Sequence, residues 1–302
     1  MACTYSSHIC LLQIMSKAVV SSTIGYPRIG ANREMKRALE AFWSSKISEE
    51  DLQNAFEAVE TAAWEAQAQA GIDLIALDST LFDQVLDFVD YLGLYPRRFK
   101  DISNGLERYF AMARGTSTAA ALSLSKYFDT NYHYLVPELD ASATPAPVWT
   151  KLLKKVQRGQ AVVGTGKAVP IVMGIATLLH LARGEFDELA LAAKIRPAYV
   201  ELLQELKKLG VPEVQVHEPV LALGSLPAWV REEVEATQRA LAAVGVPINL
   251  VVSYDDVTPE TYAWLVRLPV EALSLDFCGV PGAAHGCGTA RLIAEHGFPQ
   301  VR

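Results

Sequence analysis

The feature of this chain that most restricts its fold is a repeated alternation of short apolar, β-branched runs with longer amphipathic stretches. This alternation is typical of parallel strands buried under helices, because helices cover both faces of a parallel sheet. Strands are predicted at 19–24, 72–77, 133–136, 169–174, 213–217, 248–253 and 272–277. Helices are predicted at 33–44, 49–70, 82–91, 186–209, 227–244, 259–266 and 290–296.

The number of these units favours a TIM-like (β/α)8 barrel. Residues 298–302 read as the opening of an eighth strand, so the barrel is predicted to be truncated at the start of that strand. The 302 residues, 51% of them hydrophobic, provide enough apolar material for one large core. An open doubly wound sheet is the alternative, but no Gly-rich dinucleotide-binding loop follows the first strand.

Charge and hydropathy exclude two classes of partner. The net charge of -7 argues against a broad nucleic-acid-binding surface, although it permits a local basic pocket. No apolar run reaches the roughly 20 residues that a membrane helix needs. We therefore expect no nucleic acid and no membrane among the partners.

The four cysteines lie at the two ends of the chain, as Cys3, Cys10, Cys278 and Cys287. They lack the paired spacing of a zinc knuckle or a secreted disulfide scaffold, so a reducing, cytoplasmic location is predicted. Residues 1–18 are expected to be a disordered leader. The alternative is a transit segment for a plastid or mitochondrion, since residues 1–17 contain no acidic residue.

Residues 25–30 read Gly-Tyr-Pro-Arg-Ile-Gly and are followed by Arg-Glu-Met-Lys from Arg33. A strand that ends in this way and continues into a basic helix start offers backbone N–H groups and a guanidinium charge to a carboxylate or phosphate. The alternative interpretation is a plain turn with a solvated helix face.

Further motifs follow at 71–73, 82–87, 111–115, 126–138, 215–221 and 273–277. The most specific of them is the stretch from Lys126, Lys-Tyr-Phe-Asp-Thr-Asn-Tyr-His-Tyr-Leu-Val-Pro-Glu. In this order the motifs resemble the N-terminal domain of cobalamin-independent methionine synthase, and the resemblance covers roughly residues 20–302.

The resemblance implies a function. The family transfers a methyl group from 5-methyltetrahydrofolate, which carries a polyglutamate tail, to homocysteine bound to zinc. It implies that residues 19–302 form the folate-binding barrel domain and that a separate C-terminal domain holds the zinc and homocysteine. The matching positions for the folate tail are Asn32, Arg33, Glu34, Met35 and Lys126. The first of these is usually basic, so Asn32 predicts weaker binding of the tail.

No metal or resident cofactor is expected in this chain itself. Near its end, Cys278, His285, Cys287 and His296 could be mistaken for a metal cluster, but their spacing is irregular and the family has no ligands there. Buried cysteines and loop histidines are the more common case. The chain alone is therefore expected not to catalyse methyl transfer.

Two positions depart from the pattern that the resemblance implies. His217 and Glu218 end a predicted strand where the family has Asp-Glu-Pro, and residues 174–177 read Gly-Ile-Ala-Thr in place of Gly-Pro-Val-Thr. One alternative function is therefore an independent barrel enzyme that uses His217 and Glu218 as an acid/base pair. Another is a non-catalytic partner of a separate C-terminal domain, and a third is a degenerate fragment of the family.

Overall fold

A five-stranded parallel sheet forms the centre of the computed structural model, which describes residues 19–78, 80–277 and 287–298. Across the sheet the strands are β1 (Ile75–Leu77), β5 (Ala168–Met173), β7 (Val214–His217), β8 (Ile248–Val251) and β9 (Ala272–Ser274). Nearly every side chain of β1, β5, β7 and β8 is buried. This burial explains why these segments read as continuous apolar runs.

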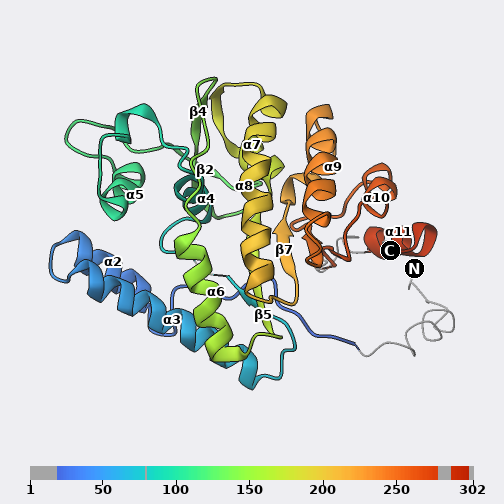
Figure 1. Ribbon diagram of the computed structural model, residues 1–302, viewed down its shortest axis with the longest axis horizontal. Helices are drawn as coiled ribbons and strands as arrows, with labels where there is room; N and C mark the ends of the chain where they lie inside the picture. The colour runs from blue at the N-terminus through green and yellow to red at the C-terminus, as the bar shows by residue number, and fades with distance from the viewer. Residues whose placement is uncertain (1–18, 79, 278–286, 299–302) are drawn as a thin grey trace.

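Helices pack against the sheet, and in Figure 1 α6 and α8 cross in front of it while α2 and α3 lie at its lower left. The α-helices are α2 (Glu34–Trp43), α3 (Glu49–Gln69), α4 (Gln84–Leu92), α5 (Gly105–Arg114), α6 (Thr150–Val163), α7 (Ile175–Leu181), α8 (Glu188–Lys208), α9 (Ala228–Ala242), α10 (Pro259–Leu265) and α11 (Cys287–His296). Two short 3-10 helices are η1 (Arg97–Phe99) and η2 (Pro219–Ala222). None of the helices in the described ranges is long and apolar enough to cross a bilayer.

Local chemistry fixes several helix ends. At the start of α3, Asp51 N–H donates to Ser48 Oγ at 3.1 Å and Ser48 N–H donates to Asp51 Oδ2 at 3.0 Å, which forms a capping box. Gly71 and Gly210, with φ of 82° and 69°, take the left-handed conformation just beyond α3 and α8.

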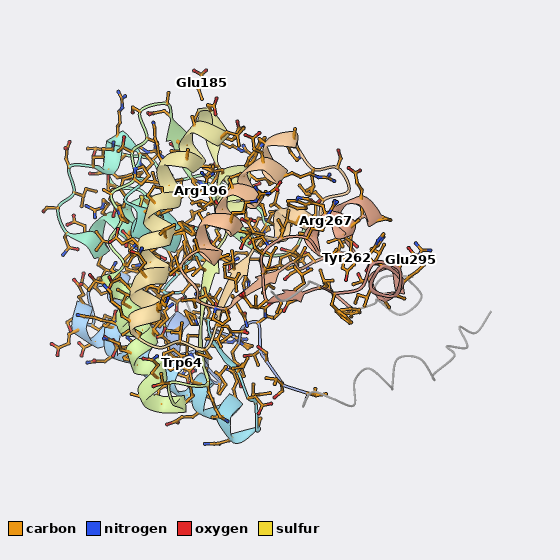
Figure 2. The ribbon with its side chains drawn as sticks, turned by 45° about the vertical axis from the view of Figure 1, so that its right-hand side comes forward. Trp64, Glu185, Arg196, Tyr262, Arg267 and Glu295 are labelled. Carbon is orange, nitrogen blue, oxygen red and sulfur yellow. The ribbon has the colours of Figure 1, made fainter. Side chains whose placement is uncertain are left out.

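Arg158 of α6 places its guanidinium 5.9 Å from the ring centre of Trp64, a buried residue of α3 labelled in Figure 2.

The first predicted strand, 19–24, lies beside β1 but forms only an isolated parallel bridge between Ser22 and Leu74. Ser21 and Asp73 continue the contact, since Ser21 N–H and Oγ–H both donate to Asp73 Oδ2 at 2.8 Å. Thr23 also accepts a hydrogen bond at its carbonyl from Gln215 Nε2 at 2.8 Å. This segment is therefore held by side chains as much as by a ladder.

The third predicted strand, 133–136, differs most from the expected barrel. As β3 (His133–Leu135) it pairs antiparallel with β2 (Leu124–Lys126), while β1 pairs directly with β5. A short parallel pair, β4 (Glu138–Asp140) with β6 (Arg183–Glu185), lies outside the central sheet. The α/β class with a parallel sheet is confirmed, but a closed eight-stranded barrel is not. The predicted eighth strand falls largely on residues 299–302, which lie outside the described residues.

Candidate functional site

A small cavity of about 70 Å³ lies at the carboxyl ends of β1, β7 and β8. Ligands of parallel α/β sheets bind at this edge, because the loops that follow the strands converge there. The polar side chains that line the cavity include Asp78, Thr80, Gln84, Asp87, Lys155, His217 and Ser253. Aromatic rings of Tyr127 and Tyr254 complete its wall.

The motif at 25–30 folds against this cavity through Asp78. A Cβ on Gly25 would lie 2.5 Å from Asp78 Oδ2, so only glycine permits the approach, and its φ of 153° also favours glycine. Asp78 accepts a backbone hydrogen bond from Tyr26 and is influenced by the positive charge of Arg28. The motif therefore brings a guanidinium to the mouth of the cavity.

Two carboxyls line the cavity, Asp87 buried and Asp78 partly buried, and desolvation raises the pKa of both. Desolvation is the main cause for Asp78 and for Asp87, and the positive charge of Lys155 opposes the rise in each case. Tyr109 supports Asp87 by donating its hydroxyl to Oδ1 at 2.6 Å. The positive charge of Lys155 thus partly offsets the effect of desolvation on the pKa of both carboxyls.

Asp83 connects the start of α4 to the β2–β3 hairpin. Its Oδ1 accepts the N–H of Leu86 at 2.8 Å and caps the helix, while its Oδ2 accepts the hydroxyl of Tyr132 at 2.7 Å. Burial raises the pKa of Asp83 to about 6 in spite of these bonds. Asp83 therefore acts as a structural clamp between the hairpin and α4.

His217 points into the cavity and is held in one tautomer. Gln215 Nε2 donates to the carbonyl of Thr23, so its Oε1 is the atom 3.1 Å from His217 Nε2 and must accept the proton from that nitrogen. Desolvation lowers the pKa of His217 to about 4. At neutral pH the ring is uncharged, with Nδ1 as its free basic atom.

Glu218 does not share the cavity with His217, because neighbouring residues of a strand point to opposite faces. Glu218 is 1% exposed, and its Oε1 and Oε2 accept the N–H groups of Ala176 at 3.2 Å and Thr177 at 2.8 Å at the start of α7. A Cβ on Gly174 would lie 1.9 Å from Glu218 Cδ. The structure therefore does not bring His217 and Glu218 together as the predicted acid/base pair.

A second buried carboxyl, Glu233 of α9, lies near Glu218. Burial and the neighbouring negative charge raise the pKa of Glu218 to about 8, and burial raises that of Glu233 to about 7. Arg196 of α8, labelled in Figure 2, lies 4.0 Å from Glu233 Oε1, and Glu233 Oε2 has no hydrogen-bond partner among the residues that the structure describes. A buried, unpartnered carboxylate oxygen is costly, so the pair retains a proton at neutral pH.

The predicted folate-tail residues at the start of α2 have different environments. Arg33 adopts a left-handed conformation with φ of 63° and is exposed, without an ion pair or hydrogen bond from its side chain to any residue that the structure describes. Glu34 folds back over the helix start, where it accepts Asn32 N–H at 2.9 Å and Nδ2–H at 3.1 Å. Met35 is buried in the core, and its N–H donates to Ile29 O at 3.2 Å.

Lys126, the fifth predicted contact, lies exposed at the end of β2, opposite His133 in the antiparallel ladder. A second and larger space, an apolar groove of about 580 Å³, runs between the loop at 26–34 and α3. Glu34 and Gly30 line one side of this groove and Ala62 and Ala66 the other. Of the predicted tail residues, Glu34 lines this groove, and none of the five lines the cavity that contains His217.

The cysteines and histidines near the end of the chain give no metal site that the structure describes. Cys278 and His285 lie outside the described residues, and so do Cys3 and Cys10. Cys287 begins α11 and His296 ends it, with the His296 ring 6.1 Å from that of Tyr262. Within the described ranges, no group of three or more His, Cys, Asp or Glu residues could hold a metal ion.

Residues 20–291 match the family described as cobalamin-independent synthase, N-terminal domain. The chain belongs to this family. It is 48% identical over 278 residues to a 5-methyltetrahydropteroyltriglutamate–homocysteine methyltransferase of Synechococcus sp. (strain JA-2-3B'a(2-13)), an alignment that covers 92% of this chain and 35% of that protein. The protein of the same name from Trichodesmium erythraeum (strain IMS101) is 43% identical, with coverage of 93% and 37%.

The chain thus spans about a third of the length of these curated relatives. Among solved structures, it is similar to a vitamin-B12 independent methionine synthase from Listeria monocytogenes, with a TM-score of 0.55 and 14% identity, over 85% of this chain and 73% of that one. At this identity the likeness shows the fold alone. Family membership therefore rests on the sequence, and the α/β fold is supported by both comparisons.

Several residues of the cavity were not anticipated as site residues from sequence. Asp78 follows a predicted strand directly, so its place at the carboxyl edge could have been inferred from the same rule that identified His217. Asp87 and Lys155 lie on helices, and no local signal marks them. Arg28 was noted in its motif, but only the fold shows that its charge reaches Asp78.

Proposed function

We propose that residues 19–302 form the N-terminal, folate-binding barrel domain of a methyltransferase that moves a methyl group from 5-methyltetrahydrofolate polyglutamate to homocysteine. Membership of the family supports this proposal, as do curated relatives named for that reaction. Because the chain spans about a third of those relatives, the zinc and homocysteine site is assigned to a separate C-terminal domain. That domain is the partner we propose for this chain.

The observation that best supports the tail-binding role is the environment of Arg33. Its guanidinium is exposed at the start of α2 and is unpaired within the described residues, and the next residue, Glu34, lines a groove large enough for a small ligand. An unpaired guanidinium is well suited to the carboxylates of a glutamate chain. Lys126 offers a second cation at the end of β2.

Glu34 limits the affinity that this arrangement can reach. Hydrogen bonds from its own backbone and from Asn32 lower the pKa of Glu34, so a fixed negative charge already lies at the positive end of α2. A tail carboxylate must bind the outer side of Arg33 or displace Glu34. With Asn32 in place of a basic residue, we propose weak, salt-sensitive binding of the tail.

The binding test compares free tri-γ-glutamate with monoglutamate by calorimetry at low and physiological salt. Arg33→Gln and Lys126→Gln should each weaken triglutamate binding several-fold. Lys46→Gln, which removes an exposed lysine beyond the far end of α2, serves as the matched control and should leave binding unchanged. Equal affinity of all three variants and the parent chain would refute the assignment of the tail site.

The catalytic part of the proposal has its own test. The chain alone should form no methionine from homocysteine and 5-methyltetrahydropteroyltriglutamate, whether or not zinc is added. Turnover by the purified chain would show that the reactive site lies within these residues, contrary to the proposal.

A further inference from the structure

Three aromatic rings form a stack at the mouth of the cavity. The ring of Phe128 lies nearly parallel to those of His180, at 5.9 Å and 15°, and Tyr254, at 6.4 Å and 13°. Tyr127 supports the stack from its edge, 5.8 Å from Tyr254 and 4.9 Å from Phe128. Tyr254 is 51% exposed, so the stack ends in a ring that is open to solvent.

The backbone that presents these rings is strained. Phe128, Asp129 and Tyr254 have φ of 47°, 59° and 84°, a region that bulky side chains rarely adopt. The segments of Phe128 and Tyr254 are about 125 residues apart, yet their rings stack. Tyr254 N–H donates to Asp276 Oδ2 at 3.1 Å, which holds the strained residue in place. Strain of this kind persists only where the surroundings enforce it, and it often marks ligand sites.

An unpaired cation lies at the same mouth. Arg28 follows Gly25 and Tyr26, which lie directly against Asp78 of the cavity. Its positive charge opposes the rise that burial causes in the pKa of Asp78 and of Tyr132, and the negative charge of Asp78 adds to the burial-driven rise in the pKa of Tyr254. Arg28 is half-buried, and its side chain forms no ion pair or hydrogen bond within the part of the chain that the structure describes. A planar donor group near an open aromatic ring suits a ligand that joins a ring to a carboxylate.

We infer that Tyr254 and Arg28 bind the p-aminobenzoyl-glutamate portion of the folate, with the benzoyl ring stacked on Tyr254 and the first carboxylate on Arg28. This inference rests on the proposed function and states how the folate is oriented, with its ring at Tyr254 and its tail running towards α2. Arg33 follows Arg28 by five positions, a span of at most about 18 Å. The later glutamates can therefore follow the loop at 28–33 from the cavity mouth to the start of α2.

The test uses p-aminobenzoyl-glutamate, which has the ring and one glutamate, and tri-γ-glutamate, which has the tail without the ring. Tyr254→Leu should weaken binding of p-aminobenzoyl-glutamate about ten-fold, the scale of one lost stacking contact. It should leave triglutamate affinity unchanged. Tyr254→Phe keeps the ring and should bind both ligands as the parent chain does. Arg28→Gln should weaken p-aminobenzoyl-glutamate in the same way.

The two ligands separate this inference from the proposed tail site. If p-aminobenzoyl-glutamate fails to bind, or binds Tyr254→Leu as well as the parent chain, the ring site is wrong even when triglutamate binds. If p-aminobenzoyl-glutamate binds in a Tyr254-dependent way and triglutamate does not, the ring site holds and the tail site is wrong. Thermal unfolding of Tyr254→Leu near the parent midpoint shows that lost binding is not lost folding.

Discussion

The buried carboxyl of Glu233 makes a quantitative prediction about pH. Its pKa is raised from the ordinary 4.5 to about 7, chiefly by burial, even with the nearby charge of Arg196 opposing the rise. Between these values the folded chain holds a proton that the unfolded chain has released, so the free energy of unfolding falls as pH rises. A shift of this size corresponds to about 3 kcal/mol. Glutamine at this position cannot ionise, so Glu233→Gln should not show this loss.

The assay is urea unfolding, followed by circular dichroism at pH 5, 6.5 and 8. Glu233→Gln and the parent chain should have similar unfolding free energies at pH 5, and the variant should be more stable at pH 8 by up to about 3 kcal/mol. Glu232→Gln, at an exposed position on the same helix, is the control and should follow the parent at every pH. If the difference between Glu233→Gln and the parent does not grow with pH, the buried carboxyl is not protonated as argued.

Two further predictions concern residues at the carboxyl ends of β5 and β7. Gly174→Ala places a Cβ 1.9 Å from Glu218 Cδ and should destabilise the chain by about 1–3 kcal/mol, whereas Gly166→Ala, with no atom within 4 Å, should have little effect on the thermal midpoint. Equal midpoints would contradict the close packing. His217, with a pKa lowered to about 4, should cost stability as pH falls from 6.5 towards 4, and His217→Gln should remove that loss. We expect this loss of unfolding free energy to be about 1–2 kcal/mol at pH 4.5, since the ring is only half-buried. Identical acid unfolding of the parent chain and His217→Gln would refute this prediction.

Helix positions were predictable from sequence where a cap is local. The prediction of 49–70 differs by one residue from α3, because Ser48 and Asp51 start that helix and Gly71 ends it. The prediction of 259–266 likewise agrees with α10, where Thr258 accepts the N–H of Thr261 at 3.1 Å. Such signals lie within one turn of the helix, so no tertiary information is needed.

Strand partners were less predictable, because periodicity identifies a strand and not its neighbour. The segment at 133–136 is a strand as predicted, but Tyr134 buries its ring in the hairpin cluster with Tyr127. β3 therefore pairs with β2 in the hairpin and not with β1, and β1 pairs with β5 directly. In the site, the carboxyl-edge rule identified His217, whereas Lys155 approaches Asp78 only through the packing of α6 on the sheet.

The contrast between His217 and Glu218 shows why a residue that departs from the family pattern can lie beside one that keeps it. Glu218 accepts three hydrogen bonds, from the N–H groups of Ala176 and Thr177 and from the Thr177 hydroxyl, and it fills the space that Gly174 leaves. A change there would require the start of α7 to change too. His217 faces a cavity, and within the described residues its side chain has one hydrogen bond, to the amide oxygen of Gln215, which accepts from any donor. The family pattern has an Asp carboxylate at position 217. A hydrogen-bond donor such as His can replace it, since Asp78 already supplies negative charge to the cavity. Residue 217 is therefore physically free to differ while residue 218 is not.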